Sequence, residues 1–258
     1  AVIVAGATEV SLRLRTAIKA LVDISGLGLD TVEFKGDGVE FGAMVRATRI
    51  VRDAQIRETV GDALPESAFA IASEPIRNLT TIGGNSVHVT RWSDTPPVMR
   101  VLGARYRIQG TADRTVDADT FFAQTPKKLL NDGDIVTHIF VPKAPQNSGS
   151  AFIKYAKTAV DYAIVNAAAY VEMDGDQIAV ARLSVGAIHT PPIRLPEAEA
   201  AATGAISDEM FAAVTAKAAA EVSPRKDPRA SDQYLRHCTG VVVRRALRTA
   251  IDRARGNS

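Results

Sequence analysis

Short apolar runs, an alternating pattern and two helical spacings follow one another in the first part of the chain. The apolar runs predict two buried strands, and the alternation on both sides of Gly36, Asp37 and Gly38 predicts a hairpin. Two stretches with helical spacing follow, separated by Gly61 and Pro65. In chain order, these segments are residues 1–5, 20–24, 32–34 with 39–41, 48–59 and 63–72.

The middle of the chain predicts a loop, a short helix or turn, and three strands before a polar linker. The loop carries the adjacent Gly83 and Gly84, and Pro142 closes the last strand. The linker contains proline, glutamine, asparagine, serine and glycine without an apolar period, which is typical of a domain boundary. These segments are residues 79–85, 96–102, 104–109, 114–116, 134–141 and 143–149.

The last part predicts a three-stranded antiparallel sheet followed by helices rich in alanine and arginine. Asp174 and Gly175 mark a hairpin turn, and Ser207 and Ser231 are suited to begin helices. The strands are residues 151–156, 163–173 and 177–185, and the helices are residues 195–203, 207–222 and 231–255. We therefore predict an α+β fold with domains at residues 1–145 and 150–258.

The composition excludes several kinds of protein. Apolar residues make up 46% and charged residues 23% of the 258, which is ordinary for a soluble globular chain. A net charge of +2, with both signs interspersed, gives no basis for nucleic-acid binding. Cys238 is the only cysteine, so this chain alone cannot hold an iron–sulfur cluster. No apolar run approaches the ~20 residues of a membrane span, and we expect a cytoplasmic location.

Two turns of small residues are candidates for a phosphate site. The first spans residues 4–10, and the second spans residues 77–85 and contains the two adjacent glycines. Small residues let successive main-chain N–H groups point into one concavity and approach a phosphate closely. Neither turn has the lysine of a P-loop or the spacing G-x-G-x-x-G. A strand end at Gly6 and a hairpin or bulge at the glycine pair are the alternatives that the residues leave open.

Several short motifs follow one another along the chain. The first turn reads A-G-A-T-E at residues 5–9, and the second reads I-R-N-L-T-T-I-G-G-N at residues 76–85, followed by S-D at residues 93–94. Later motifs are F-F at 121–122, P-P-I-R at 191–194 and D-P-R-A-S-D at 227–232. Together they resemble the FAD-binding medium subunit of the molybdenum hydroxylases, the family of xanthine dehydrogenase and aerobic carbon monoxide dehydrogenase.

The resemblance implies a two-lobed FAD-binding domain with mixed sheets, in which FAD lies between the lobes. Both turns would hold its diphosphate, and Asp94 would fix the ribose or the nearby loop. Residues 71–72 would flank the adenine, whereas Val136, Lys154 and Tyr162 would lie near the isoalloxazine. The implied cofactor-binding residues are Val4, Ala5, Gly6, Ala7, Thr8, Glu9, Val10, Ile71, Ala72, Thr81, Ile82, Gly83, Gly84, Asn85, Asp94, Val136, Lys154 and Tyr162. No side chain is implied as a catalyst or a metal ligand.

The chain departs from the family pattern at three places. Ala7 replaces the second glycine of A-G-G-T, which a negative φ would allow. Arg91, next to Trp92, stands in a stretch where the family often has a proline. The opening strands and helix of the family do not precede Ala1, so we expect an incomplete N-terminal lobe.

The resemblance also implies partners. In this family a large subunit hydroxylates the substrate at a molybdenum cofactor, and [2Fe–2S] clusters on a small subunit pass electrons to FAD and on to an external acceptor. We therefore expect a dimer of heterotrimers. A stand-alone flavin oxidoreductase that acts on its own small substrate is one alternative, and a nucleotide-binding module without a redox role is another.

Overall fold

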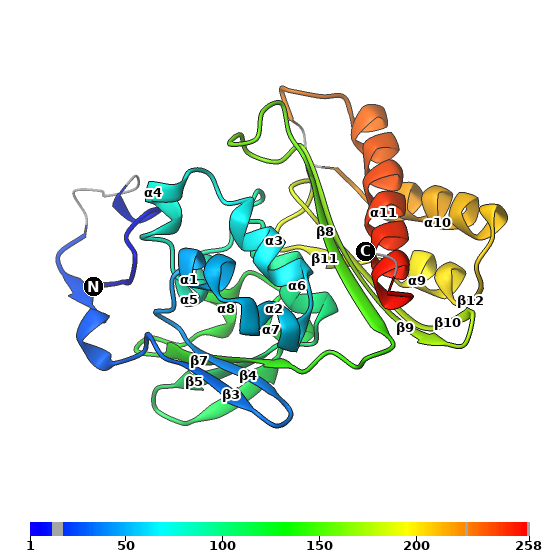
Figure 1. The fold of residues 1–258 in the computed structure, drawn as a ribbon. Helices are drawn as coiled ribbons and strands as arrows, with labels where there is room; N and C mark the ends of the chain where they lie inside the picture. The colour runs from blue at the N-terminus through cyan, green and yellow to red at the C-terminus, as the bar shows by residue number, and fades with distance from the viewer. Residues whose placement is uncertain (12–17, 225–226, 257–258) are drawn as a thin grey trace.

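The computed structural model describes residues 1–11, 18–224 and 227–256 of the chain (Figure 1). Within these ranges a first sheet, a layer of short helices, a second sheet and the C-terminal helices follow one another in space. A small lobe at the N-terminus lies beside the helix layer. The predicted α+β class is confirmed.

The first sheet is antiparallel in the order β3-β4-β7-β5-β6. The predicted hairpin is confirmed, because Val32 pairs with Phe41 and Lys35 pairs with Gly38 across its turn. The strands are β3 (Val32–Lys35), β4 (Gly38–Gly42), β5 (Arg105–Gln109), β6 (Arg114–Asp117) and β7 (Ile135–Pro142).

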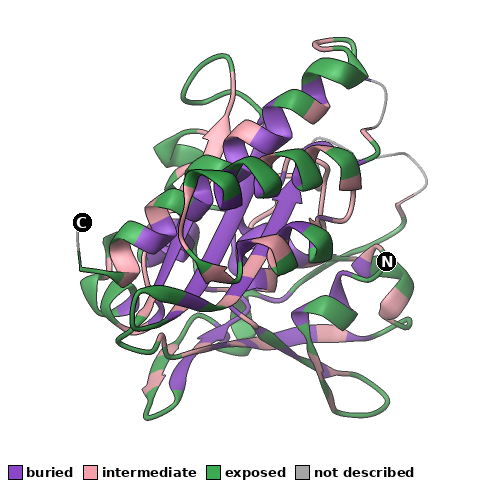
Figure 2. Ribbon diagram, turned by 90° about the vertical axis from the view of Figure 1, so that its right-hand side faces the viewer, coloured by how far each residue is buried: buried purple, intermediate pink, exposed green. Residues whose placement is uncertain are grey.

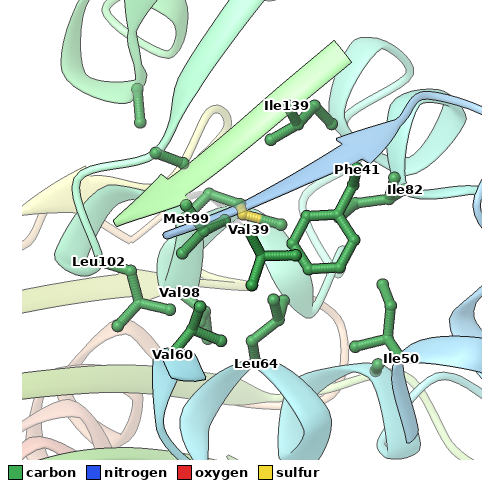
Figure 3. Packing of buried hydrophobic residues seen from close by; sticks show 14 of the residues in the cluster. Val39, Phe41, Ile50, Val60, Leu64, Ile82, Val98, Met99, Leu102 and Ile139 are labelled. Atoms are coloured by element: carbon green, nitrogen blue, oxygen red, sulfur yellow. The ribbon is translucent and has the colours of Figure 1, made fainter. Parts of the chain in front are cut away.

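Short helices cover one face of this sheet and form the first core with it (Figure 3). Phe41 and Ile139 from the sheet and Ile50, Leu64 and Met99 from the helices are each at most 1% exposed. The predicted helix at residues 48–59 is two helices, because the chain is extended at Asp53 between them. The helices are α1 (Ala47–Arg52), α2 (Ala54–Val60), α3 (Ala63–Phe69), α4 (Glu74–Arg77), α5 (Ile82–Val87), α6 (Thr95–Val101), α7 (Ala118–Phe121) and α8 (Pro126–Leu129).

The second sheet contains the three predicted strands and two short additions. The long strands are β8 (Ser148–Tyr155), β9 (Val165–Asp174) and β10 (Gln177–Gly186), all antiparallel. The prediction of three strands is too small, because β11 (Ile193–Arg194) and β12 (Gly204–Ala205) also pair with β10. Two-residue strands carry too short a pattern to be read from sequence.

Helices cover both faces of β9, so successive side chains of this strand enter different cores. Ala167 and Ala169 pack in the core with the C-terminal helices, whereas Ala168 and Tyr170 pack in the core of the N-terminal half. Burial on both faces explains why β9 is a nearly continuous apolar run. Figure 2 shows the buried strands beneath helices whose outer faces are exposed.

The C-terminal helices are α9 (Pro196–Ala202), α10 (Asp208–Glu221) and α11 (Asp232–Ala254). The predicted helix starts are confirmed. The hydroxyl oxygen of Ser207 accepts the N–H of Met210, and that of Ser231 accepts the N–H of Tyr234, both at 3.2 Å.

The N-terminal lobe differs from the prediction of two buried strands. Strands β1 (Val2–Val4) and β2 (Leu21–Asp23) do form and pair in parallel, followed by the 3-10 helix η2 (Ser25–Leu27). Leu21 and Val22 are nevertheless 52% and 46% exposed. The apolar run correctly predicted that a strand forms here. It did not predict the exposure of the strand, because burial requires other elements to pack over it.

One arginine joins the two halves of the chain. Arg253 of α11 donates to the carbonyl oxygen of Ser150 at 2.7 Å and pairs with the carboxylate of Glu66 on α3. The same carboxylate accepts the N–H of Phe152 on β8 at 3.0 Å. Glu66 therefore serves a side chain and a main-chain amide from the second half at once.

We expect Glu66→Ala to lower the free energy of unfolding by about 1–3 kcal/mol, because it removes the acceptor of the Phe152 N–H and the carboxylate that pairs with the partly buried Arg253. Glu74→Ala is the matched control, since it removes an ion pair with Arg52 that is mostly exposed on both sides. Urea denaturation of both variants measures the difference. Equal losses would contradict the assigned role of Glu66.

Candidate functional site

The two predicted turns meet. Gly6 has no room for a side chain, because a Cβ there would lie 1.7 Å from the carbonyl oxygen of Leu79. A Cβ at Gly84 would lie 3.9 Å from the Cβ of Ala5, which is ordinary contact. Segments far apart in the sequence therefore converge at one place, as predicted.

Ala7 has a φ of +58°, so the condition under which alanine would be tolerated here, a negative φ, is not met. Its carbonyl oxygen accepts the N–H of Ser11 at 2.9 Å, which closes the turn. The left-handed conformation costs alanine about 1–2 kcal/mol more than glycine. The turn thus keeps the conformation that glycine favours at this position, although the residue is alanine.

The second turn is not the predicted loop throughout, because its glycines lie in the first turn of α5. Thr81 begins this helix, and its hydroxyl oxygen accepts the N–H of Gly84 at 3.1 Å. A Cβ at Gly83 would lie 2.6 Å from the Cβ of Ala43, so this glycine allows the helix start to pack closely on the chain before α1. Sequence spacing does not separate a glycine loop from a glycine-bearing helix start.

The main-chain amides of the two turns differ in availability. In the second turn, the N–H groups of Ile82 and Gly83 donate to the carbonyls of Val45 and Ala43, both at 2.9 Å, and the N–H of Asn85 donates to Thr81. These amides therefore have acceptors within the protein in this conformation, and their binding of a phosphate stays a prediction.

The first turn has main-chain N–H groups that are available to a ligand. The N–H groups of Gly6, Ala7 and Thr8 have no hydrogen-bond acceptor among the described residues, and all three residues are partly exposed. Consecutive unpaired amides in a turn with a left-handed residue form an anion-binding concavity. The residues of the first turn therefore fit the diphosphate of a dinucleotide, with neutral donors.

A hydrogen-bonded path leads from the second turn to Asp94. The amide oxygen of Asn85 accepts the hydroxyl of Thr95 at 2.6 Å, and Thr95 follows Asp94 at the start of α6. Ala5 is thus connected to the buried Asp94 through Gly84, Asn85 and Thr95.

Asp94 is the buried charge of the site. Its carboxylate accepts Lys154 Nζ at 3.0 Å and Asn166 Nδ2 at 2.9 Å, and its side chain is 5% exposed. Burial raises the pKa of Asp94 to about 6, while Lys154 and Asn166 act in the opposite direction. Lys154 also donates to the carbonyl of Ala70 at 2.8 Å. This network joins α6 to β8 and β9, so the site contains residues from both halves.

The predicted adenine segment adjoins this network. The carbonyls of Ile71 and Ala72 accept Arg77 Nη1 at 2.9 and 3.2 Å. Arg77 also lies over the ring of Phe69, 5.0 Å from its centroid. Residues 71–72 are therefore held firmly at the edge of the site, between Arg77 and the carbonyl that binds Lys154.

The two remaining predicted residues lie in different surroundings. Val136 is 4% exposed within the core of the first sheet, so it offers almost no surface to a ligand. Tyr162 is 56% exposed and stacks on Trp92, with ring centroids 4.8 Å apart. Trp92 lies two residues before Asp94 in the chain, so this ring contact brings Tyr162 near the loop that carries that aspartate.

Thr95, Asn166 and Arg77 are site residues that the sequence analysis missed. Asn166 carried a usable signal, because it is a fully buried polar residue inside the apolar run of β9. Such a residue needs a hydrogen-bond partner, and here the partner is Asp94. Thr95 and Arg77 carried no comparable signal.

Two shallow hollows lie on the surface. The hollow beside the site, about 300 Å³, is lined by Lys154, Ala156, Lys157, Thr158 and Ala159. The larger one, about 380 Å³, lies on the outer face of the first sheet near Arg105 and Phe140, away from both turns. In the described ranges, no cluster of three or more metal-ligating side chains occurs, and no helix has the length and apolarity to cross a membrane.

The fold and the site define an FAD-binding subunit of an oxidoreductase. The family described as FAD binding domain in molybdopterin dehydrogenase matches residues 1–144, and the CO dehydrogenase flavoprotein C-terminal domain matches residues 150–250. The chain belongs to this family of FAD-binding subunits of molybdenum hydroxylases.

Relatives and solved structures agree with this assignment. The carbon monoxide dehydrogenase medium chain of Afipia carboxidovorans is 28% identical over 91% of this chain and 82% of its own. The putative xanthine dehydrogenase FAD-binding subunit of Escherichia coli is 28% identical over 98% and 90%. A carbon monoxide dehydrogenase structure from Hydrogenophaga pseudoflava superposes with a TM-score of 0.91 at 27% identity, covering 97% of this chain and 89% of that one.

Asp94 predicts a pH dependence of stability. Its folded pKa of about 6 lies above its ordinary value of 3.8, so between these values the folded state binds more protons than the unfolded state. The contribution of Asp94 to the free energy of unfolding is therefore fully present below about pH 4. This contribution decreases, by roughly 3 kcal/mol in total, as the pH rises through 6.

We expect Asp94→Asn to remove this slope while retaining the contact with Asn166. Denaturation with urea at several values of pH from 4 to 7 measures the slope in both proteins. If the variant keeps the slope of the wild type, the carboxyl group of Asp94 is not its source.

Proposed function

We propose that this chain binds FAD along the line from Gly6 to Tyr162 and acts as the electron-transfer subunit of a molybdenum hydroxylase. The observation that carries the proposal is the contact between the two turns, together with the amides of Gly6, Ala7 and Thr8, which have no acceptor within the described ranges. When bound, FAD supplies the redox chemistry by accepting electrons and passing them on.

The residues have distinct roles in this proposal. Val4, Ala5, Glu9 and Val10 shape the first turn, whose amides bind the diphosphate. Thr81, Ile82, Gly83 and Gly84 support that turn from below through close packing, since most of their amides are already paired. Asn85 keeps its side-chain NH₂ group available, because only its oxygen is bonded among the described residues. Asp94 and Lys154 orient the ribose side and the ring side of the cofactor.

We propose that the two halves contribute differently. Residues 1–145 form the FAD-binding domain, and residues 150–258 form the C-terminal domain that supplies Lys154, Asn166 and Tyr162. The hydrogen bonds from Lys154 and Asn166 to Asp94 support this division of labour, because each crosses between the halves.

The proposed partners are an iron–sulfur small subunit and a molybdopterin large subunit. The relatives are medium chains or FAD-binding subunits by name, which supports a multi-subunit complex. The single cysteine of this chain cannot supply the thiolates of a [2Fe–2S] cluster, which supports the proposal that the cluster lies on another chain. A dimer of heterotrimers, an external acceptor and a cytoplasmic location stay predictions.

Gly6→Ala tests the cofactor site. The added Cβ would collide with the carbonyl of Leu79, so the first turn must move, and we expect FAD affinity to fall at least about tenfold. Gly26→Ala is the control, because nothing lies within 4 Å of a Cβ there. FAD content, from the visible absorbance of the purified proteins, and titration with FAD measure the effect. Undiminished affinity in Gly6→Ala would refute the proposed site.

Purification without a tag separates the subunit from the stand-alone flavin oxidoreductase. We expect the chain to co-purify with iron–sulfur and molybdenum subunits. A yellow monomer that oxidises a small substrate without partners would favour the alternative, and a colourless protein that binds adenine nucleotides would favour a module without a redox role.

A further inference from the structure

Trp92 and Tyr162 form an aromatic pair beside the site, in which Trp92 is half-buried and Tyr162 is exposed. Trp92 lies in the loop between α5 and α6, and Tyr162 lies in the connection between β8 and β9. Their rings are tilted by 31° with centroids 4.8 Å apart, and Tyr162 is more than half exposed. Two separate loops thus present one aromatic surface, although neither loop has regular structure to hold it.

Both loops are held by a single carboxylate, that of Asp227. On one side it accepts Arg91 Nη2 at 2.9 Å, and Arg91 is the neighbour of Trp92. On the other side it accepts Arg229 Nη2 at 2.8 Å. Its side chain is 2% exposed, so these two arginines replace the water that an aspartate normally binds.

Each arginine also bonds directly to the chain that it positions. Arg229 donates to the carbonyl of Tyr162 at 3.2 Å and to that of Ala163 at 3.1 Å. Arg91 donates through Nε to the carbonyl of Ala187 at 3.0 Å, which ties the Trp92 loop to the second half. Asp227 therefore lies at the centre of a bridge between the two aromatic residues.

The charge of Asp227 is stable under all ordinary conditions. The hydrogen bond from Arg229 lowers the pKa of Asp227 to about 2, against the opposing effect of burial. The bridge is thus permanently ionised rather than a switch. A charge-assisted, bidentate arrangement of this kind fixes geometry more than it adds stability.

We propose that Asp227 is a positioning residue that locks Trp92 and Tyr162 into an aromatic wall against which the flat ring of the flavin packs. The proposal rests on the proposed function, since Trp92 lies two residues before Asp94 in the loop that leads into α6. Aromatic side chains bind planar rings by offset stacking, and both members of the pair are large enough to do so. Arg91, which departs from the family pattern, is the residue that brings Trp92 under the control of Asp227.

Trp92 is the only tryptophan of the chain, so its fluorescence reports on this wall alone. We would compare the full-length wild type, Asp227→Asn and Arg91→Gln by acrylamide quenching without FAD and by FAD-induced quenching. Both variants should raise the acrylamide quenching constant roughly twofold, because the Trp92 loop gains freedom. They should also reduce the FAD-induced quenching while FAD still binds.

Asp134→Asn is the matched control, since Asp134 is also fully buried and bonded to an arginine, but in the first sheet. It should leave Trp92 quenching unchanged. If Asp227→Asn fails to fold, Arg91→Gln decides, because Arg91 is partly exposed and leaves the Arg229 bridge intact.

The outcomes separate the two proposals. Wild-type acrylamide quenching in the variants would overturn the role of Asp227, whether or not FAD binds. Bound FAD that leaves wild-type Trp92 fluorescence unchanged would overturn the wall. A wild type that binds no FAD would instead refute the proposed function, while the acrylamide measurement would still decide the role of Asp227.

Discussion

The close approach of Gly6 to the carbonyl of Leu79 is the constraint on which the rest of the site depends. No side chain fits between these main chains, so the first turn can take its position only because the residue is glycine. The second turn is fixed in its place by pairing with residues 43–47 and by the helix start at Thr81. The second turn is therefore a fixed support, and the first presents main-chain amides that have no acceptor in the part of the chain that the structure describes. The two turns are therefore not equivalent in the proposed FAD site.

A buried charge connects the two halves of the chain at the other end of the site. Asp94 loses water on folding, and Lys154 and Asn166 only partly compensate, which is why its pKa is raised. Such a network adds little stability, but it requires α6, β8 and β9 to be correctly placed before its hydrogen bonds can form. Asp227 is also a buried carboxylate, but its pKa is lowered rather than raised, because it pairs with two arginines. Asp94 thus joins the start of α6 to two strands, whereas Asp227 holds two loops.

The sequence predicted the regular elements well, because their patterns are local. The hairpin at Gly36–Gly38, the three long strands of the second sheet and the starts of α10 and α11 follow from periodicity and capping. The sequence-based predictions failed where exposure or backbone conformation depends on contacts with distant parts of the chain. The exposure of Leu21 and Val22, the left-handed Ala7 and the helical position of Gly83 are set by contacts that no local pattern contains. For the same reason Val136, implied by resemblance, lies in the core, whereas Asn166 was missed.

A crystal structure with FAD bound, of the purified chain or of its complex with partner subunits, tests the central claim most directly. The account predicts that the diphosphate oxygens lie within hydrogen-bonding distance of the N–H groups of Gly6, Ala7 and Thr8, and that the helix start at Thr81 keeps its internal hydrogen bonds. A diphosphate bound anywhere else, with the amides of the first turn facing solvent, would contradict it.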